Sequence, residues 1–116
     1  MKVSIKKNIG PRCIIKEDGQ KIYDTIYELL ERGENVTLDF HGVIQVTSLF
    51  FNFAIGQLLR DFQEGDLHRL LKNINLNETG QLVVERVMEN SVKYHRDKDY
   101  RKIVDEILEQ QASESN

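Results

Sequence analysis

The sequence has few of the features that mark disulfide scaffolds or membrane proteins. Its single cysteine, Cys13, excludes an internal disulfide, and a lone thiol next to two isoleucines is expected to be a small buried hydrophobe. The longest apolar run, residues 49–55, is interrupted by Asn52 and is far too short to cross a bilayer. The first residues lead straight into a strand-like pattern without a signal-peptide core. We therefore expect a cytoplasmic protein that does not bind membranes.

The sequence also lacks a strong excess of charge of either sign. The net charge is −3, and the 16 lysines and arginines are interleaved with 19 aspartates and glutamates. Because nucleic-acid binding needs a clustered basic field, this distribution speaks against a nucleic-acid partner. The three histidines, His41, His68 and His95, lie outside the H-x-x-x-H and C-x-x-C spacings that present two metal ligands from one turn or helix. We expect no metal and no cofactor.

The composition and the length of the chain suit a single domain with one hydrophobic core. Apolar residues make up 40% and charged residues 30% of the 116 residues, an ordinary balance for a globular domain. A chain of this length buries roughly two-thirds of its unfolded surface and needs no covalent staple. Residues 1–110 are predicted to form a single domain. Residues 111–116 have nothing to bury and are predicted to be a disordered tail.

Hydrophobic periodicity in the first third predicts a strand, a helix and a second strand. Val3 and Ile5 alternate with polar residues, as in a strand with one wet face, and residues 36–40 repeat that pattern. Between them, residues 17–32 place apolar side chains on one helical face, with acidic residues at the start and Gly33 just past the end. This order favours a sheet covered by helices.

Apolar residues at helical spacing predict three further helices. The first runs over residues 50–62 and ends at Gly65. The second continues to His95 and starts after residues 75–78, which resemble a capping box with Asn in place of Ser or Thr. The third covers residues 100–108. The intervening residues 67–76 fit either a short strand or a helical turn leading into one, and we favour a strand at residues 70–74.

Motifs that commonly carry chemistry on α/β sheets are missing. No nucleophile with a base, paired carboxylates or metal cluster is recognisable. The Gly10-Pro11-Arg12 turn lacks the spacing of either phosphate-binding glycine motif, and G-x-x-x-x-G-K-[ST] is absent. The sequence therefore favours a protein that is not an enzyme.

Two adjacent hydroxyls, Thr47 and Ser48, stand where an apolar strand-like approach meets the helix predicted over residues 50–62. A hydroxyl at such a place has two interpretations. It caps the helix by accepting a backbone N–H, which contributes about 1 kcal/mol and needs no function. Alternatively it accepts a phosphate, whose charge would face the positive end of the helix and create or abolish a protein contact.

Residues from Val36 to about Asp97 carry a resemblance to a known family. The segments that carry it are Leu38-Asp39-Phe40, Val46-Thr47-Ser48-Leu49-Phe50-Phe51-Asn52-Phe53-Ala54-Ile55-Gly56-Gln57-Leu58, Asn75-Leu76 and Val87-Met88-Glu89-Asn90. The chain resembles the STAS-like domain of unknown function DUF4325, a family of small bacterial, archaeal and viral proteins. The resemblance implies an α/β STAS-like fold, with a mixed sheet of about four strands backed by three to four helices.

The STAS fold is also the scaffold of anti-sigma-factor antagonists, which offer the start of their second helix to a kinase-like ATPase. In those antagonists an Asp-Ser-Ser/Thr-Gly segment carries the phosphorylated hydroxyl. That segment falls here on Thr47-Ser48-Leu49-Phe50, where Thr47 replaces the acidic residue, Leu49 occupies the acceptor position and Phe50 replaces the glycine. The resemblance therefore implies a constitutive binding surface rather than a phosphorylation switch.

Three functions are compatible with these features. The first is a non-enzymatic regulatory module that binds a protein, such as a histidine-kinase-like ATPase, through Thr47, Ser48 and Asn52. Asn52 is equally well interpreted as a structural amide that ties the helix to the preceding loop. The second is a small-ligand or nucleotide sensor in which Arg12 and the two hydroxyls hold an anion. The third is a self-associating protein in which residues 100–108 bury their apolar stripe in a second copy, forming a homodimer.

Overall fold

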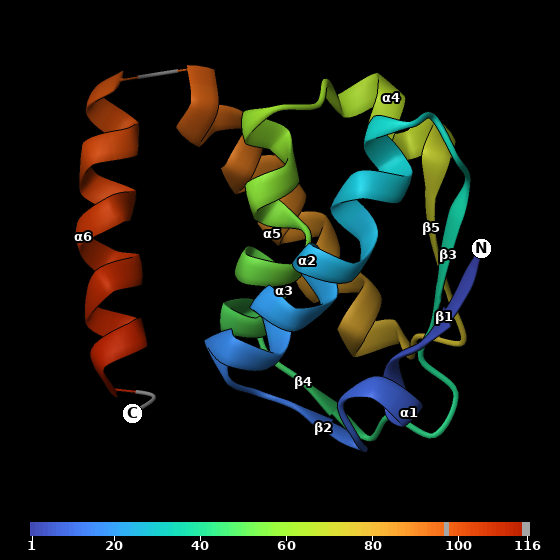
Figure 1. Cartoon of the computed structure of the whole chain (residues 1–116). Helices are drawn as coiled ribbons and strands as arrows, with labels where there is room; N and C mark the ends of the chain where they lie inside the picture. The colour runs from blue at the N-terminus through green and yellow to red at the C-terminus, as the bar shows by residue number, and fades with distance from the viewer. Residues whose placement is uncertain (97, 115–116) are drawn as a thin grey trace.

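The computed structural model describes residues 1–96 and 98–114 of an α/β fold. Its central sheet has three parallel strands in the order β1 (Lys2–Ser4), β3 (Val36–Asp39) and β5 (Leu71–Ile74). Val36 lies opposite Leu71 in the register of β3 and β5. Figure 1 shows this sheet on the right, with the longest helices on its left-hand side.

Two short strands, β2 (Arg12–Cys13) and β4 (Gln45–Val46), pair in parallel with each other and not with the central sheet. The backbone N–H groups of Ile44 and Gln45 both donate to the carbonyl of Pro11, at 2.8 and 3.3 Å. Since β4 draws its hydrogen bonds from the β2 segment, it does not extend the central sheet. The predicted single mixed sheet of about four strands is therefore wrong in strand number and in direction.

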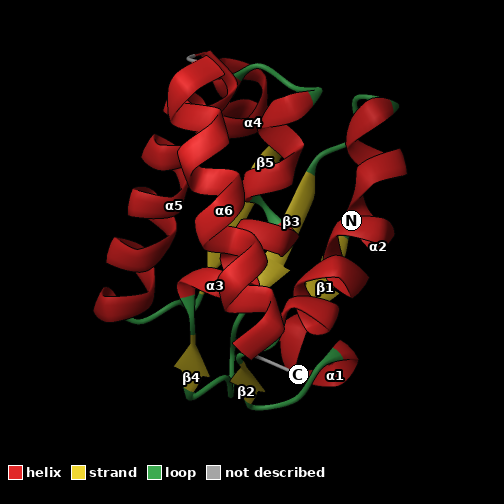
Figure 2. Cartoon of the chain, turned by 90° about the vertical axis from the view of Figure 1, so that its left-hand side faces the viewer, coloured by secondary structure: helices red, strands yellow, loops and turns green. Residues whose placement is uncertain are grey.

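The described residues form six α-helices and one 3₁₀ helix, more than the three to four helices predicted. They are α1 (Ile5–Asn8), α2 (Lys16–Glu31), α3 (Ser48–Ala54), η1 (Gly56–Arg60), α4 (Glu64–Leu70), α5 (Glu78–Arg96) and α6 (Lys98–Glu114). Helices α2, α3 and α5 lie between the sheet and α6 (Figure 1). Figure 2, which looks from the α6 side, shows that α6 runs across the front of α3.

Helix α2 confirms the prediction for residues 17–32. Its buried residues Ile22, Ile26 and Leu30 recur every fourth position and form the stripe that faces the core. Gly33 follows the helix with a φ of +80°, a left-handed conformation that glycine adopts without steric cost. The periodicity and the glycine therefore place this helix and its end correctly.

The helix predicted over residues 50–62 is shorter and broken. Helix α3 ends at Ala54, and after Ile55 the chain continues as η1. At Gly56 the backbone passes so close to α5 that an added Cβ would lie 2.7 Å from Ser91 Oγ. Glycine is a poor helix former and permits this close approach. The break falls one residue before it, although the apolar pattern of the sequence continues to Phe62.

The region between η1 and α5 contains both of the structures that fit its sequence. Residues 67–70 complete α4, and residues 71–74 form β5. The cap of α5 lies two residues later than predicted, because Asn77 Oδ1 accepts the N–H of Gly80 at 2.7 Å. Asn75 instead takes a left-handed φ of +59° and donates from Nδ2 to Asp39 Oδ1 at 2.8 Å.

The first predicted strand is also cut short. Ser4 Oγ accepts the N–H of Lys7 at 3.2 Å and caps α1, so the strand ends at Ser4 and Ile5 becomes the first helical residue. Ile5 is nevertheless fully buried. The alternation of Val3 and Ile5 thus identified two core residues, although the backbone between them changes from strand to helix.

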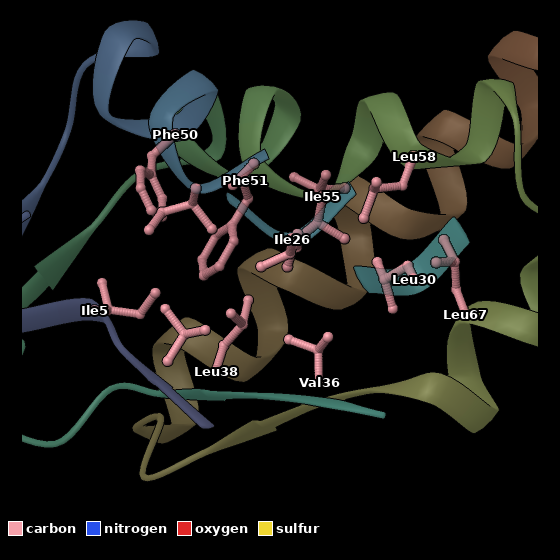
Figure 3. Close-up of a cluster of buried hydrophobic side chains, with 14 of the residues drawn as sticks. Ile5, Ile26, Leu30, Val36, Leu38, Phe50, Phe51, Ile55, Leu58 and Leu67 are labelled. Atoms are coloured by element: carbon pink, nitrogen blue, oxygen red, sulfur yellow. The ribbon is translucent and has the colours of Figure 1, made fainter. Parts of the chain in front are cut away.

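The core lies between the sheet and the layer of α2 and α3. Figure 3 shows Leu38 of β3 and Phe50 and Phe51 of α3 within one cluster of buried side chains. The rings of Phe50 and Phe51 meet edge to face, with centroids 5.4 Å apart. Cys13 belongs to the same core with 0% of its surface exposed, which confirms the predicted buried thiol. No described helix is long and apolar enough to cross a membrane.

Helix α6 continues through Glu114, past the domain boundary predicted at residue 110. Val104 and Leu108 are half-buried, whereas Ile103 and Ile107 are 58% and 49% exposed. The apolar stripe of this helix is therefore only partly covered within one chain. Self-association through residues 100–108 stays a prediction, and the side chain of Tyr100 and residues 115–116 lie outside the described residues.

Candidate functional site at the start of helix α3

Thr47 joins β4 to α3 and caps the helix. Its Oγ1 accepts the N–H of Phe50 at 3.1 Å, and its hydroxyl donates to the carbonyl of Ile14 at 2.8 Å. Its own N–H donates to the carbonyl of Cys13 at 3.1 Å, which continues the β2–β4 pairing by one residue. The hydroxyl therefore both donates and accepts a hydrogen bond inside the chain, and the capping interpretation accounts for Thr47.

Ser48 and Asn52 have no such internal role. Ser48 is the first residue of α3 and is exposed, and its hydroxyl makes no hydrogen bond with any described residue. Asn52 follows one turn later on the same side of the helix and is half-buried. Its amide has no hydrogen-bond partner in residues 1–96 and 98–114, so the proposed tie to the preceding loop is not formed.

Asn52 lines a cleft of about 640 Å³ whose walls come from α3, η1, α5 and α6. Gly56 and Ser91 line it where η1 meets α5. Across the cleft, the hydroxyl of Tyr94 on α5 donates to the carboxylate of Asp105 on α6. The cleft thus combines a polar lining with a size in the range of small-molecule sites.

Sequence reasoning did not find the residues of α5 and α6 that line this cleft. One local signal existed, because Ser91 places a hydroxyl among the apolar positions of the helix that ends near His95. A polar residue on an apolar face indicates that this part of the face does not meet a dry core. The contribution of α6 had no comparable signal, since it depends on how that helix docks.

Arg12 lies on the β2–β4 ribbon, with its side chain held by a neighbour. Its Nη1 donates to Oε1 of Gln45 at 2.9 Å, and the two residues lie opposite each other in the parallel pair. Gln45 precedes Thr47 by two residues, so both point to the same side of the strand. The structure therefore brings Arg12 near the strand end, where its guanidinium bonds to Gln45. Anion binding at Arg12 stays a prediction.

At the end of β3, the polar side chain of Asp39 has its hydrogen-bond partners within the chain. Asp39 accepts hydrogen bonds from Asn75 Nδ2 at 2.8 Å and from the N–H of His41 at 2.9 Å, and Lys2 Nζ lies 3.5 Å away. These bonds, the one from Asn75 first, lower the pKa of Asp39 by stabilising its charged form. Asp39 is accounted for by structure, in contrast to Ser48 and Asn52.

The thiol of Cys13 lies beneath the same ribbon and is chemically quiet. Burial, with a smaller contribution from the charge of Asp18, raises the pKa of Cys13 to about 11. Among the described residues, no three His, Cys, Asp or Glu side chains gather into a group that could hold a metal ion. The described chain therefore offers hydroxyl, amide and carboxylate groups around the cleft, suited to hydrogen bonding.

Comparison with protein families places the residues of α3 in a wider group. The model of a STAS-like domain of unknown function (DUF4325) matches residues 18–81, more than half of the chain. The chain belongs to this STAS-like family. The match runs from α2 to the first turn of α5, so it includes Thr47, Ser48 and Asn52 and leaves out Arg12 and α6. No curated protein and no solved structure is detectably similar to the chain.

Proposed function

We propose that this STAS-like chain is a non-enzymatic regulatory module that binds another protein through the α3 surface, defined as Ser48, Asn52 and the adjoining cleft. The observation that carries the proposal is the pair of unused hydrogen-bonding groups on one side of α3. Neither side chain makes a hydrogen bond with a described residue. Ser48 is exposed and Asn52 lines the cleft, so both side chains are available to bond to a binding partner.

The location of the pair supports a protein partner. Ser48 is exposed, and the cleft next to Asn52 is bordered by apolar as well as polar side chains, including Phe53 and Leu108. Protein interfaces combine a central apolar area with hydrogen bonds at its rim. In anti-sigma-factor antagonists, which share the STAS fold, the start of the second helix is offered to a kinase-like ATPase. We therefore propose a histidine-kinase-like ATPase in a partner-switching system as the partner.

We propose that binding is constitutive rather than controlled by phosphorylation. Leu49, at the position where antagonists of the STAS type carry the acceptor, has no hydroxyl and is 9% exposed. Thr47 uses its hydroxyl in two internal hydrogen bonds. Ser48 is the remaining hydroxyl of the segment, and its role in the proposal is to donate and accept hydrogen bonds across an interface.

Binding to a candidate histidine-kinase-like ATPase from the same genome tests the proposal. The two purified proteins are mixed without nucleotide, with ADP and with ATP, and the complex is measured by calorimetry. Ser48→Arg and Asn52→Arg are expected to weaken binding by roughly tenfold or more, since each places a bulky charge in the interface. Thr25→Arg, which puts the same side chain on an exposed position of α2, is the matched control and should bind normally. Absence of a complex in all three nucleotide states would contradict the proposal.

The size of the cleft favours a second candidate, a small-ligand sensor. A volume of about 640 Å³ lies within the ordinary range for small-molecule pockets. Thermal unfolding with a panel of nucleotides separates the two candidates. A concentration-dependent rise in Tm favours the sensor, because a ligand that binds the native state alone stabilises it in proportion to the logarithm of its concentration.

A further inference from the structure

A second pocket, of about 340 Å³, lies on another part of the molecule between α4, β5 and α5. Its innermost side chains are apolar, since Ile55 and Leu67 are each 1% exposed. Leu71 and Asn73, two residues apart on β5, point to the same face of the strand and enter the pocket together. The pocket therefore has an apolar base with one amide in its wall.

The amide of Asn73 leaves an acceptor without a donor. Its Oδ1 is buried, and no hydrogen-bond partner for it exists among residues 1–96 and 98–114. Leaving a buried carbonyl oxygen unpaired is costly, and folded proteins seldom do so without a bound water, ion or ligand. Asn73 lines the pocket, so a small rotation of its side chain would turn this oxygen toward an N–H or O–H group that enters.

The mouth of the pocket is negatively charged. Glu85 and Glu89 lie one turn apart on α5, and Glu64 lies on α4. All three are exposed, none forms an ion pair with a described residue, and no lysine or arginine lines the pocket. Two carboxylates at positions i and i+4 of a helix repel each other, so a cation placed between them removes an unfavourable interaction. His68 is the remaining titratable group that lines the pocket.

From these three features we infer that the pocket binds a primary alkylammonium group, the chemistry of a lysine side chain or of a free aliphatic diamine. An ammonium group has three N–H donors and no acceptor, so one N–H meets Asn73 Oδ1 while its charge faces the glutamates. Its alkyl stem packs on Leu67 and Leu71. An organic cation fits better than a metal ion, because no described group of three acidic, His or Cys side chains converges as metal ligands do.

Titration with two probes, followed by the amide NMR signals of the whole chain, tests the inference. The probes are 1,5-diaminopentane and a short peptide with one internal lysine, and 1,5-pentanediol is the neutral control. We expect saturable shifts at residues 64–74 and 84–89 with an amine probe, no such shifts with the diol, and binding that weakens as salt rises from about 0.02 to about 0.3 M. Saturation with the diamine alone identifies a free amine as the ligand, and saturation with the peptide alone identifies a protein lysine.

Two variants decide whether the pocket itself binds. Glu85→Gln/Glu89→Gln should weaken amine binding by roughly tenfold, whereas Glu28→Gln/Glu31→Gln, an equal charge change on α2, should leave it unchanged. Asn73→Leu should abolish binding and at the same time raise Tm, since it removes the unpaired carbonyl. Equal weakening in the two glutamine pairs, or no saturable shift with either probe, would overturn the inference. The result does not depend on the α3 surface.

Discussion

The two sides of helix α3 differ in how closely they are packed. On the side of α2, Gly19 meets the α3 backbone so closely that an added Cβ would press on the carbonyl oxygen of Phe50 and lie 3.1 Å from the N–H nitrogen of Ala54. On the side of α5 and α6, a cleft of about 640 Å³ opens and the amide of Asn52 has no partner in the described chain. One helix thus has a side with no free space and a side with unused polar groups.

This difference separates stability from recognition. The packed side holds α3 through the close backbone contact at Gly19 and through buried aromatic rings such as that of Phe50. Any volume added at Gly19 must displace main-chain atoms. The open side contributes little to the stability of the fold, because the side chains of Ser48 and Asn52 make no hydrogen bond with the described residues. We therefore expect substitutions on the packed side to lower the free energy of unfolding, and those on the open side to alter binding alone.

The largest effect is expected at Gly19. Gly19→Ala should lower the free energy of unfolding by about 3 kcal/mol, because the atoms it meets belong to the backbone of α3 and cannot rotate away. Gly65→Ala on α4 is the matched control. An added Cβ there meets nothing within 4 Å, so the same change should raise stability by about 0.5 kcal/mol. Denaturant unfolding of both variants measures the contrast, and equal effects would show that the α2–α3 contact is not tight.

The second effect concerns Cys13, which lies in the packed region. Because burial raises the pKa of Cys13 to about 11 from its ordinary value of 9.0, the reactive thiolate is about a hundredfold scarcer near pH 8 than in an exposed cysteine. Alkylation of the native protein should be at least that much slower than alkylation in guanidinium chloride. Gly19→Ala should speed the reaction by loosening the fold. A native rate equal to the unfolded rate would contradict the buried position.

Thr47 marks the border between the two sides, and its replacement should have a smaller effect. Thr47→Val removes the acceptor for the Phe50 N–H and the donor to the Ile14 carbonyl, and should cost about 1–2 kcal/mol. Thr47→Ser keeps both bonds and should stay within about 0.5 kcal/mol of the parent protein. Urea unfolding compares the two variants. A similar loss in both would show that the methyl group, and not the hydroxyl, supports this position.

The sequence predicted the elements that depend on local pattern. Helix α2 and strand β3 follow from periodicity that continues over the whole element, and Thr47 was one of two caps named in advance. Elements that depend on remote contacts were misjudged. The break after Ala54 lies next to Gly56, where the chain packs closely against Ser91 on α5. Strand β4 is not part of the central sheet, because its hydrogen bonds go to the carbonyl of Pro11 and its neighbours.

The site divides in the same way. Thr47, Ser48 and Asn52 were identified as a group because they surround a strand-to-helix junction, which is a local feature. Which of the hydroxyls is occupied could not be predicted, since Thr47 bonds to Ile14, on a segment far away in sequence. The cleft beside Asn52 requires α3, η1, α5 and α6 to meet, and no spacing within one segment encodes that arrangement.

The smallest effect on stability is expected on the open side. Ser48→Ala and Asn52→Ala should each change the free energy of unfolding by no more than about 0.5 kcal/mol, because neither side chain has a hydrogen bond to lose within the described chain and alanine suits a helix. Chemical unfolding measures these free energies together with that of Thr47→Val, a neighbouring substitution that is expected to destabilise the protein. A loss above about 1 kcal/mol for Asn52→Ala would make that amide a structural group, and the α3 surface would lose the half-buried free donor on which partner binding rests.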